Sequence, residues 1–281
     1  MGKALVFDSI GINDFLGKID LSLNDGMNIV VRNYVNKLSS AISDAQIEAL
    51  MDFYTTLENA GLWNNIAYFY PMFGNVKDCA YGLKGEDLII PEGSVYNKGI
   101  DLTNAEGGFG YLGKGIRIGN AGLLKNSTQN YALIFNLSYG IDENTRGWVY
   151  TMGDLISQGE EWRRGGFGHS TLQFNATIGP SEVYLQKGYK GVFAETHKFG
   201  TTPEHKLYNN NVVLSSVVGQ YSSIDKYTDY FAINASPQSY SSHLVNVPLN
   251  MILVYKDIYL DESMMYIVSE AIGQLSKVLF E

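Results

Sequence analysis

Histidine and cysteine are the residue types that most often carry chemistry, and in this sequence they are scattered. The four histidines, His169, His197, His205 and His243, lack the His-x₃-His spacing that places two imidazoles on one helical face. Cys79 is the single cysteine, so it has no neighbouring thiolate, and we interpret it as a small buried apolar residue. From these spacings we expect no metal site and no cofactor.

The acidic residues do not form a catalytic pattern either. A glycosidase built on a β-sandwich needs two carboxylates across the sugar, and the laminarinase motif sets Glu, Asp and Glu at alternate positions of one strand. Glu160 and Glu161 are adjacent instead, and Asp142-Glu143-Asn144 is interpreted as a solvated turn. The sequence also contains no Gly-x-Ser-x-Gly elbow and no phosphate-binding loop. We therefore predict no catalytic residues and a protein that is not an enzyme.

Aromatic and basic side chains offer a candidate binding site. The glycine-flanked segment 158–168 is predicted to be an exposed loop that holds Trp162, Arg163, Arg164 and Phe167. Trp and Arg are frequent at interface hot spots, and aromatic rings stack on sugar faces. These four residues are our candidate contacts for a partner protein or a glycan. The alternative is a loop that only covers the edge of the fold.

Composition limits the classes of partner. The 281 residues include 20 Lys and Arg against 29 Asp and Glu, which gives a net charge of −9. Such a surface repels phosphate backbones and anionic membranes, so we expect neither nucleic acid nor membrane as a partner. No apolar stretch reaches the roughly 18 residues that a membrane helix needs, and the N-terminus lacks the apolar region of a signal peptide.

Two helices are predicted to flank the chain's central part. The first covers about 43–60, where Ser43 and Gln46 can form a capping box and Gly61 provides the stop. The second covers about 261–278, with Asp261 as its N-cap. Each helix carries one apolar stripe, which is typical of a packing face.

Short strands are predicted between the two helices. They alternate apolar and polar residues, as a sheet with one buried face requires, and Gly, Asn and Ser separate them. The predicted strands are 131–139, 171–178, 182–186, 211–218, 230–235 and 249–255. This pattern predicts a mainly β protein, an antiparallel β-sandwich or jelly roll with two flanking α-helices. Residues 41–281 would form the sandwich, and residues 1–40 an N-terminal arm or attachment segment.

Four motifs in the first third of the chain carry a family resemblance. They are residues 43–50 (SDAQIEAL), 59–63 (NAGLW), 67–74 (AYFYPMFG) and 80–84 (AYGLK). The pattern resembles tail-fibre and minor structural proteins of tailed bacteriophages, in which a helix ending in Ala-Gly-Ile/Leu-Trp leads to a Tyr-Pro-x-x-Gly turn and an Asn-Leu-Lys strand. Here Gly82 replaces the usual Asn. A second match is at residues 254–257 (VYKD) and 260–263 (LDES), before and at the start of the last helix.

The resemblance implies a fold and a function. It implies a concanavalin-like, laminin-G-like jelly roll that serves as a virion fibre, decoration or tail-associated adhesion component, made in the bacterial host cytoplasm. Other virion proteins are then the expected partners, together with copies of the same chain, a homo-oligomer with a trimer favoured, and host surface polysaccharide. No catalytic residues come with it. The alternatives are a stand-alone carbohydrate-binding lectin module and a glycan depolymerase.

Overall fold

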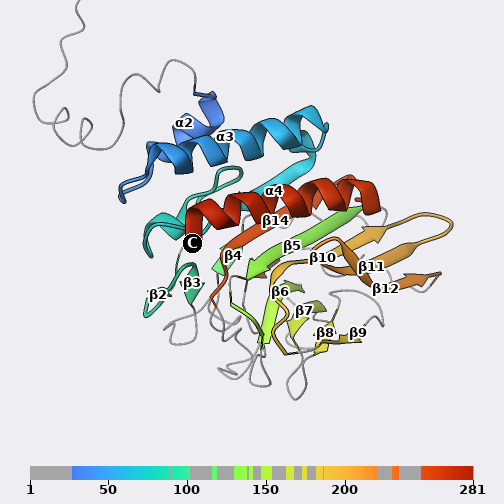
Figure 1. Ribbon diagram of the computed structural model, residues 1–281. Coiled ribbons are helices and arrows are strands. Elements are labelled where there is room, and N and C mark those ends of the chain that lie inside the picture. Colours follow the sequence, from blue (N-terminus) through green and yellow to red (C-terminus); the bar gives the residue numbers. More distant parts are fainter. Residues whose placement is uncertain are drawn as a thin grey trace, which may run out of the picture.

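The fold is a sandwich of two antiparallel sheets with helices on one outer face (Figure 1). It was obtained as a computed structural model, which describes residues 27–88, 90, 92–101, 116–118, 130–137, 139–141, 147–153, 163–167, 173–175, 182–185, 187–219, 230–233 and 248–280. The predicted fold class is thereby confirmed. None of the described helices combines the length and apolar character that crossing a membrane requires.

The first sheet lies under the helices and has six strands in the order β1-β14-β5-β10-β11-β12. Their bounds are Ile66–Tyr70 (β1), Met251–Lys256 (β14), Tyr131–Leu137 (β5), Gly191–Lys198 (β10), Glu204–Asn209 (β11) and Val212–Val218 (β12). Every residue of β5 is buried, so the expectation of one buried face is wrong for this strand. The reason is that the helices cover one face of this sheet, and apolar side chains between the two sheets cover the other face, so the sheet is buried between two layers.

The second sheet has the strand order β4-β13-β6-β7-β8-β9. Its strands span Ile116–Ile118 (β4), Tyr230–Ile233 (β13), Gly147–Gly153 (β6), Arg163–Phe167 (β7), Gln173–Asn175 (β8) and Glu182–Tyr184 (β9). A separate two-stranded sheet pairs Val95–Tyr96 (β2) with Ile100–Asp101 (β3). The predicted loop over 158–168 is therefore wrong for residues 163–167, which form strand β7 between β6 and β8. Gly165 and Gly166 of β7 have low β-propensity, so this segment is a strand only because it pairs with β6 on one side and β8 on the other.

Both predicted helices are present. Helix α3 spans Asp44–Asn59, and Ser43 and Gln46 form the predicted capping box. Helix α4 spans Glu262–Phe280, and the Asp261 carboxylate accepts a hydrogen bond from the Met264 backbone N–H at 2.9 Å. A third helix, α2 (Ile29–Val35), was not predicted; at seven residues it has too few turns to show a helical period.

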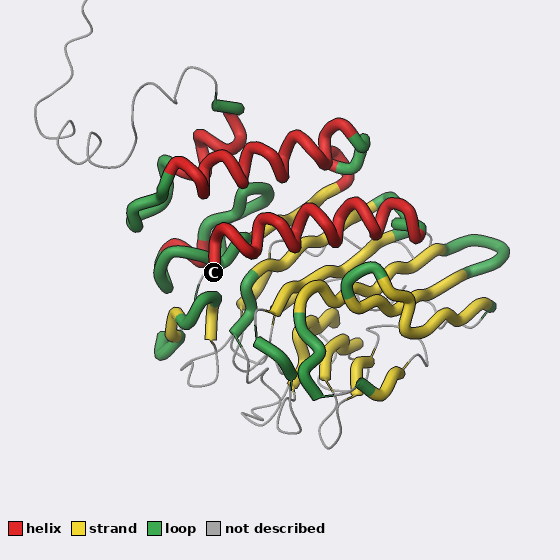
Figure 2. Tube along the Cα trace, in the orientation of Figure 1, coloured by secondary structure: helices red, strands yellow, loops and turns green. Residues whose placement is uncertain are grey.

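Two apolar cores share the first sheet. The helix-side core joins its outer face to the helices and includes Ala132, Ile134, Leu253, Val268 and Ile272. The inter-sheet core lies on the opposite face and includes Leu133, Phe135, Phe193, Leu207 and Val254. Alternate residues of each strand thus enter different cores, as the two-residue period of a strand requires. Figure 2 shows α3 and α4 stacked over the strands on the same side.

Residues 27–40 pack within the helical layer. Val31 and Tyr34 of α2 are fully or almost fully buried in the helix-side core. The Asp78 carboxylate then accepts backbone hydrogen bonds from Ser39 and Ser40. The rest of the predicted N-terminal arm, residues 1–26, lies outside the described residues, so the attachment role of residues 1–40 stays a prediction.

Candidate functional site

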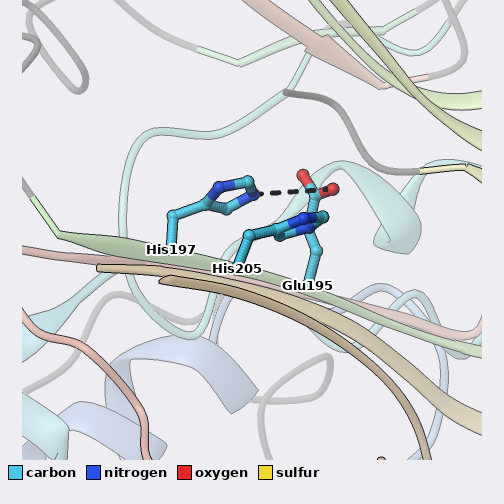
Figure 3. A group of neighbouring side chains, drawn as sticks. All are labelled: Glu195, His197 and His205. Carbon is cyan, nitrogen blue, oxygen red and sulfur yellow. Dashed lines mark ion pairs between the residues drawn. The ribbon is translucent and has the colours of Figure 1, made fainter. Parts of the chain in front are cut away.

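Three side chains of metal-binding type meet on the inter-sheet face of the first sheet. Glu195 and His197 are two residues apart on β10, so they point to the same face. His205 on β11 is the direct cross-strand partner of His197. One ligand atom from each residue lies within 4.8 Å of the other two, and Figure 3 shows all three side chains rising from the same side of the sheet. We call these three residues the inter-sheet cluster.

The inter-sheet cluster is closed to solvent. Its residues are at most 1% exposed. The His197 ring stacks between two neighbours, Tyr131 of β5 at 4.2 Å and His205 at 4.3 Å between ring centroids. A substrate from solution cannot reach these groups while the sandwich is closed. The chemistry open to the cluster is therefore coordination of a small ion or proton uptake, and not turnover of a bulky substrate.

Burial sets the protonation of both imidazoles. It lowers the pKa of His197 to about 3, because the buried site disfavours the charged ring. It lowers the pKa of His205 to about 3 as well, with further repulsion from His197 and a smaller opposing effect of Glu195. His197 Nε2 lies 3.7 Å from Glu195 Oε2, a contact that is an ion pair only with a protonated ring. At neutral pH both rings are therefore uncharged, and each carries a nitrogen lone pair.

The histidine spacing did not predict this cluster, because the His-x₃-His rule tests only whether two histidines share a helical face. The relevant spacing is that of a β-hairpin: His197 and His205 are equidistant from Thr201, in a turn that contains Gly200 and Pro203. A hairpin centred there pairs the two histidines and places Glu195 on the same face. The signal was available, but only after β10 and β11, neither of which we predicted, had been recognised as strands.

The predicted contact residues are only partly covered by the structure. Trp162 lies outside the described residues. Arg163, Arg164 and Phe167 lie on β7, and only the backbone of this strand is described. Their role as contacts for a partner or a glycan stays a prediction, with a strand in place of the expected loop.

Comparison with known proteins places the fold. No protein-family model and no curated protein sequence matches the chain. Among solved structures, a Trypanosoma rangeli sialidase in complex with 2,3-difluorosialic acid is similar, with a TM-score of 0.50 and 14% identity over 90% of this chain and 39% of the sialidase chain. Domain 4 of AbnA, a GH43 extracellular arabinanase from Geobacillus stearothermophilus, in complex with arabinotriose, has a TM-score of 0.46 and 11% identity over 73% of this chain and 98% of that domain.

These similarities concern the fold alone. The sialidase match is at 14% identity and the chain covers 39% of the sialidase, so it shows a shared sandwich architecture and carries no information on activity. The arabinanase domain falls below a TM-score of 0.5, and no conclusion about this chain is based on it. The chain is thus an antiparallel β-sandwich.

Proposed function

We propose that this chain is a non-enzymatic structural protein of a tailed-bacteriophage virion, a lectin-like fibre, decoration or tail-associated adhesion component. One observation carries the proposal: the two segments with the family resemblance, 43–84 and 254–263, form one structural unit. Strand β1 of the first segment pairs with β14, which leads into the second, with Ile66 opposite Tyr255 and Tyr70 opposite Ile252. Helix α3 also packs against α4, as Figure 1 shows. Motifs about 170 residues apart thus belong to one folding unit.

The helix exit in this unit is held by the motif residues themselves. Trp63 is 6% exposed and meets the ring of Tyr54 edge-on, with 4.8 Å between centroids. The Lys84 ammonium donates a hydrogen bond to the Trp63 carbonyl oxygen at 2.6 Å and lies 5.0 Å from the centre of the Trp63 ring. Residues 63 and 84, the ends of two quoted motifs, are thus joined by a hydrogen bond and a cation–π contact.

The turn after β1 is equally constrained. The Tyr70 hydroxyl donates to the Glu86 carbonyl oxygen at 2.7 Å. Gly74 has φ +98°, a conformation that L side chains rarely adopt, and a Cβ there would lie 2.9 Å from a carboxylate oxygen of Asp78. These motif residues have structural roles, which supports a family defined by its scaffold and not by an active site.

The proposal extends to partners and assembly. We propose other virion proteins as partners, a homo-oligomer with a trimer favoured, and host surface polysaccharide as a further ligand at Trp162, Arg163, Arg164 and Phe167. The acidic charge of −9 supports partners that are neither nucleic acid nor anionic membrane. Light scattering of the purified full chain tests the assembly, because a monomer mass contradicts the homo-oligomer.

Mass spectrometry of purified, salt-washed virions from the producing host tests the main proposal. The expected result is stoichiometric recovery of this chain with the major structural proteins. Its absence from particles, with the protein free in the lysate, contradicts a structural role. Glycan arrays then decide between the lectin and depolymerase alternatives: bound and intact glycan indicates a lectin, and shortened glycan an enzyme. Loss of array binding in Trp162→Ala would assign that residue to the glycan site.

A further inference from the structure

We propose that Glu195, His197 and His205 bind one Zn²⁺ ion inside the sandwich. The chemical basis is the set of donors, two imidazole nitrogens and one carboxylate oxygen, which is a common set for zinc in proteins. This inference concerns the interior of the fold and does not depend on the function proposed above.

The backbone already brings the three donors together. Glu195 and His197 alternate along β10, and His205 is opposite His197 across the β10–β11 ladder. Side chains in such positions have Cβ atoms about 4.5–7 Å apart, close enough for three side chains to reach one ion. Each contributes an atom to a group no wider than 4.8 Å. Strands β10 and β11 lie inside the sheet, because β10 also pairs with β5 and β11 with β12. The positions of both strands are therefore fixed on each side.

The charges suit a divalent cation. Histidine coordinates a metal through the lone pair of a ring nitrogen, and His197 and His205 each offer one such atom to the cluster. Glu195 contributes the one carboxylate of the cluster and is 1% exposed. A carboxylate oxygen is also a common ligand of divalent cations in proteins.

The surroundings would strengthen the interaction. The cluster shares its face with the apolar side chains of Leu133, Phe193 and Leu207, which belong to the inter-sheet core. In such a low-dielectric environment, attraction between an ion and its ligands is much less screened than in water. The ion would connect β10 to β11 and stabilise the hairpin from within. Three protein ligands leave a fourth coordination position of a tetrahedral ion.

Binding requires one defined movement. The two imidazole planes are nearly parallel, at 14°, so one ion cannot lie in the planes of both rings as they stand. Zinc bonds of 2.0–2.1 Å place tetrahedral ligand atoms about 3.4 Å apart, so atoms now up to 4.8 Å apart must approach. We expect rotation of one ring about its Cβ–Cγ bond to bring these atoms together, because that torsion has broad minima in histidine. Zinc binding should therefore abolish the stacking of His197 on His205.

The test is metal titration of the full chain after removal of metals with a chelator. We expect one zinc per chain by calorimetry and by elemental analysis. At a zinc concentration a hundredfold above Kd, the midpoint of thermal unfolding should rise by about 5–10 °C. A melting temperature unchanged by zinc, with no metal retained, overturns the proposal.

Variants assign the ligands. Glu195→Gln, His197→Gln and His205→Gln should each weaken zinc binding at least 100-fold. The matched control is the double variant His169→Gln/His243→Gln, which removes the other two histidines of the chain and should bind zinc as the unmodified protein does. Zinc binding that survives in His205→Gln, or that disappears in the control, overturns the assignment.

A spectroscopic measurement decides the case if the cluster variants do not fold. Cobalt(II) in a four-coordinate site absorbs strongly in the visible range, whereas hydrated cobalt absorbs weakly. In the His169→Gln/His243→Gln variant, His197 and His205 are the only imidazoles left. A strong visible band at one cobalt per chain in that variant supports the proposal, and a spectrum of hydrated cobalt alone refutes it.

Discussion

Replacing Asp78 with alanine should loosen the attachment of α2 to the rest of the fold. The Asp78 side chain is fully buried. One carboxylate oxygen accepts from the Ser39 N–H at 2.7 Å and the Ser39 hydroxyl at 2.8 Å. The other accepts from the Ser40 N–H at 2.8 Å and the Asn75 amide at 3.0 Å. Residues 39 and 40 lie between α2 and α3, so this carboxylate holds the connection between the two helices.

The expected loss follows from these bonds. Hydrogen bonds to a charged group each contribute about 1.5–3 kcal/mol, and four donors lose their acceptor in Asp78→Ala. Ser39 is exposed and Ser40 half-buried, so water can take over part of the bonding. We therefore expect a loss of about 2–4 kcal/mol in the free energy of unfolding, less than the sum of the four bonds.

The pH dependence of this contribution has a definite sign. Burial alone would raise the pKa of Asp78, but the hydrogen bonds from Ser39 and Ser40 outweigh it and the pKa is lowered from the ordinary value of 3.8. A lowered pKa in the folded state means stability that is present above pH 3.8 and is lost as pH falls through the folded value. The difference between the unmodified protein and Asp78→Ala should therefore shrink only below about pH 4.

Asp87 offers a matched control on the same segment. Its carboxylate pairs with the Lys37 ammonium at 2.7 Å, but both side chains are 41% exposed. Such pairs contribute about 0–1 kcal/mol, so Asp87→Ala removes the same charge at little cost. Urea unfolding gives both values, and hydrogen exchange over residues 29–40 should accelerate in Asp78→Ala only. Equal losses in the two variants, or unchanged exchange in Asp78→Ala, would refute the reasoning.

Three further predictions concern backbone strain, capping and acid. Gly85→Ala should lower the free energy of unfolding by about 3 kcal/mol or more, because the new Cβ would overlap a neighbouring tyrosine ring. Gly188 has a similar φ but open space around it, so Gly188→Ala should lower the free energy of unfolding by about 1 kcal/mol. Urea unfolding of both variants compares the two losses. Ser43→Ala removes the capping box and should cost about 0.5–2 kcal/mol by the same assay. Burial lowers the folded pKa values of His197 and His205 to about 3, against 6.5 when unfolded, so the metal-free protein should lose stability as pH falls from 6.5 to 3, by up to about 3 kcal/mol per pH unit. A flat profile in buffered urea titrations would contradict this.

Local signals were sufficient for the elements that local chemistry defines. The capping box of Ser43 and Gln46, the stop at Gly61 and the cap at Asp261 each involve residues within about four positions of one another. Helices α3 and α4 therefore appear within two residues of their predicted ends. Alternation and turn residues likewise predicted six strands, since β-period and Gly or Asn turns are properties of short windows.

Elements that depend on distant partners could not be predicted in this way. Strand β7 contains Gly165 and Gly166, and its pairing with β6 and β8 compensates for their low propensity. Strand β1 was not among the predicted strands, and its partner β14 lies at the other end of the chain. Helix α2 shows no pattern of its own, and the burial of Val31 and Tyr34 against the other helices stabilises it.

The inter-sheet cluster shows how a register determines chemistry that composition hides. His197 and His205 were interpreted as dispersed because they are eight residues apart, yet the β10–β11 register makes them direct partners. A shift of that register by one residue would turn one histidine to the helix-side core and leave the other with Glu195. The cluster therefore exists only in the folded hairpin.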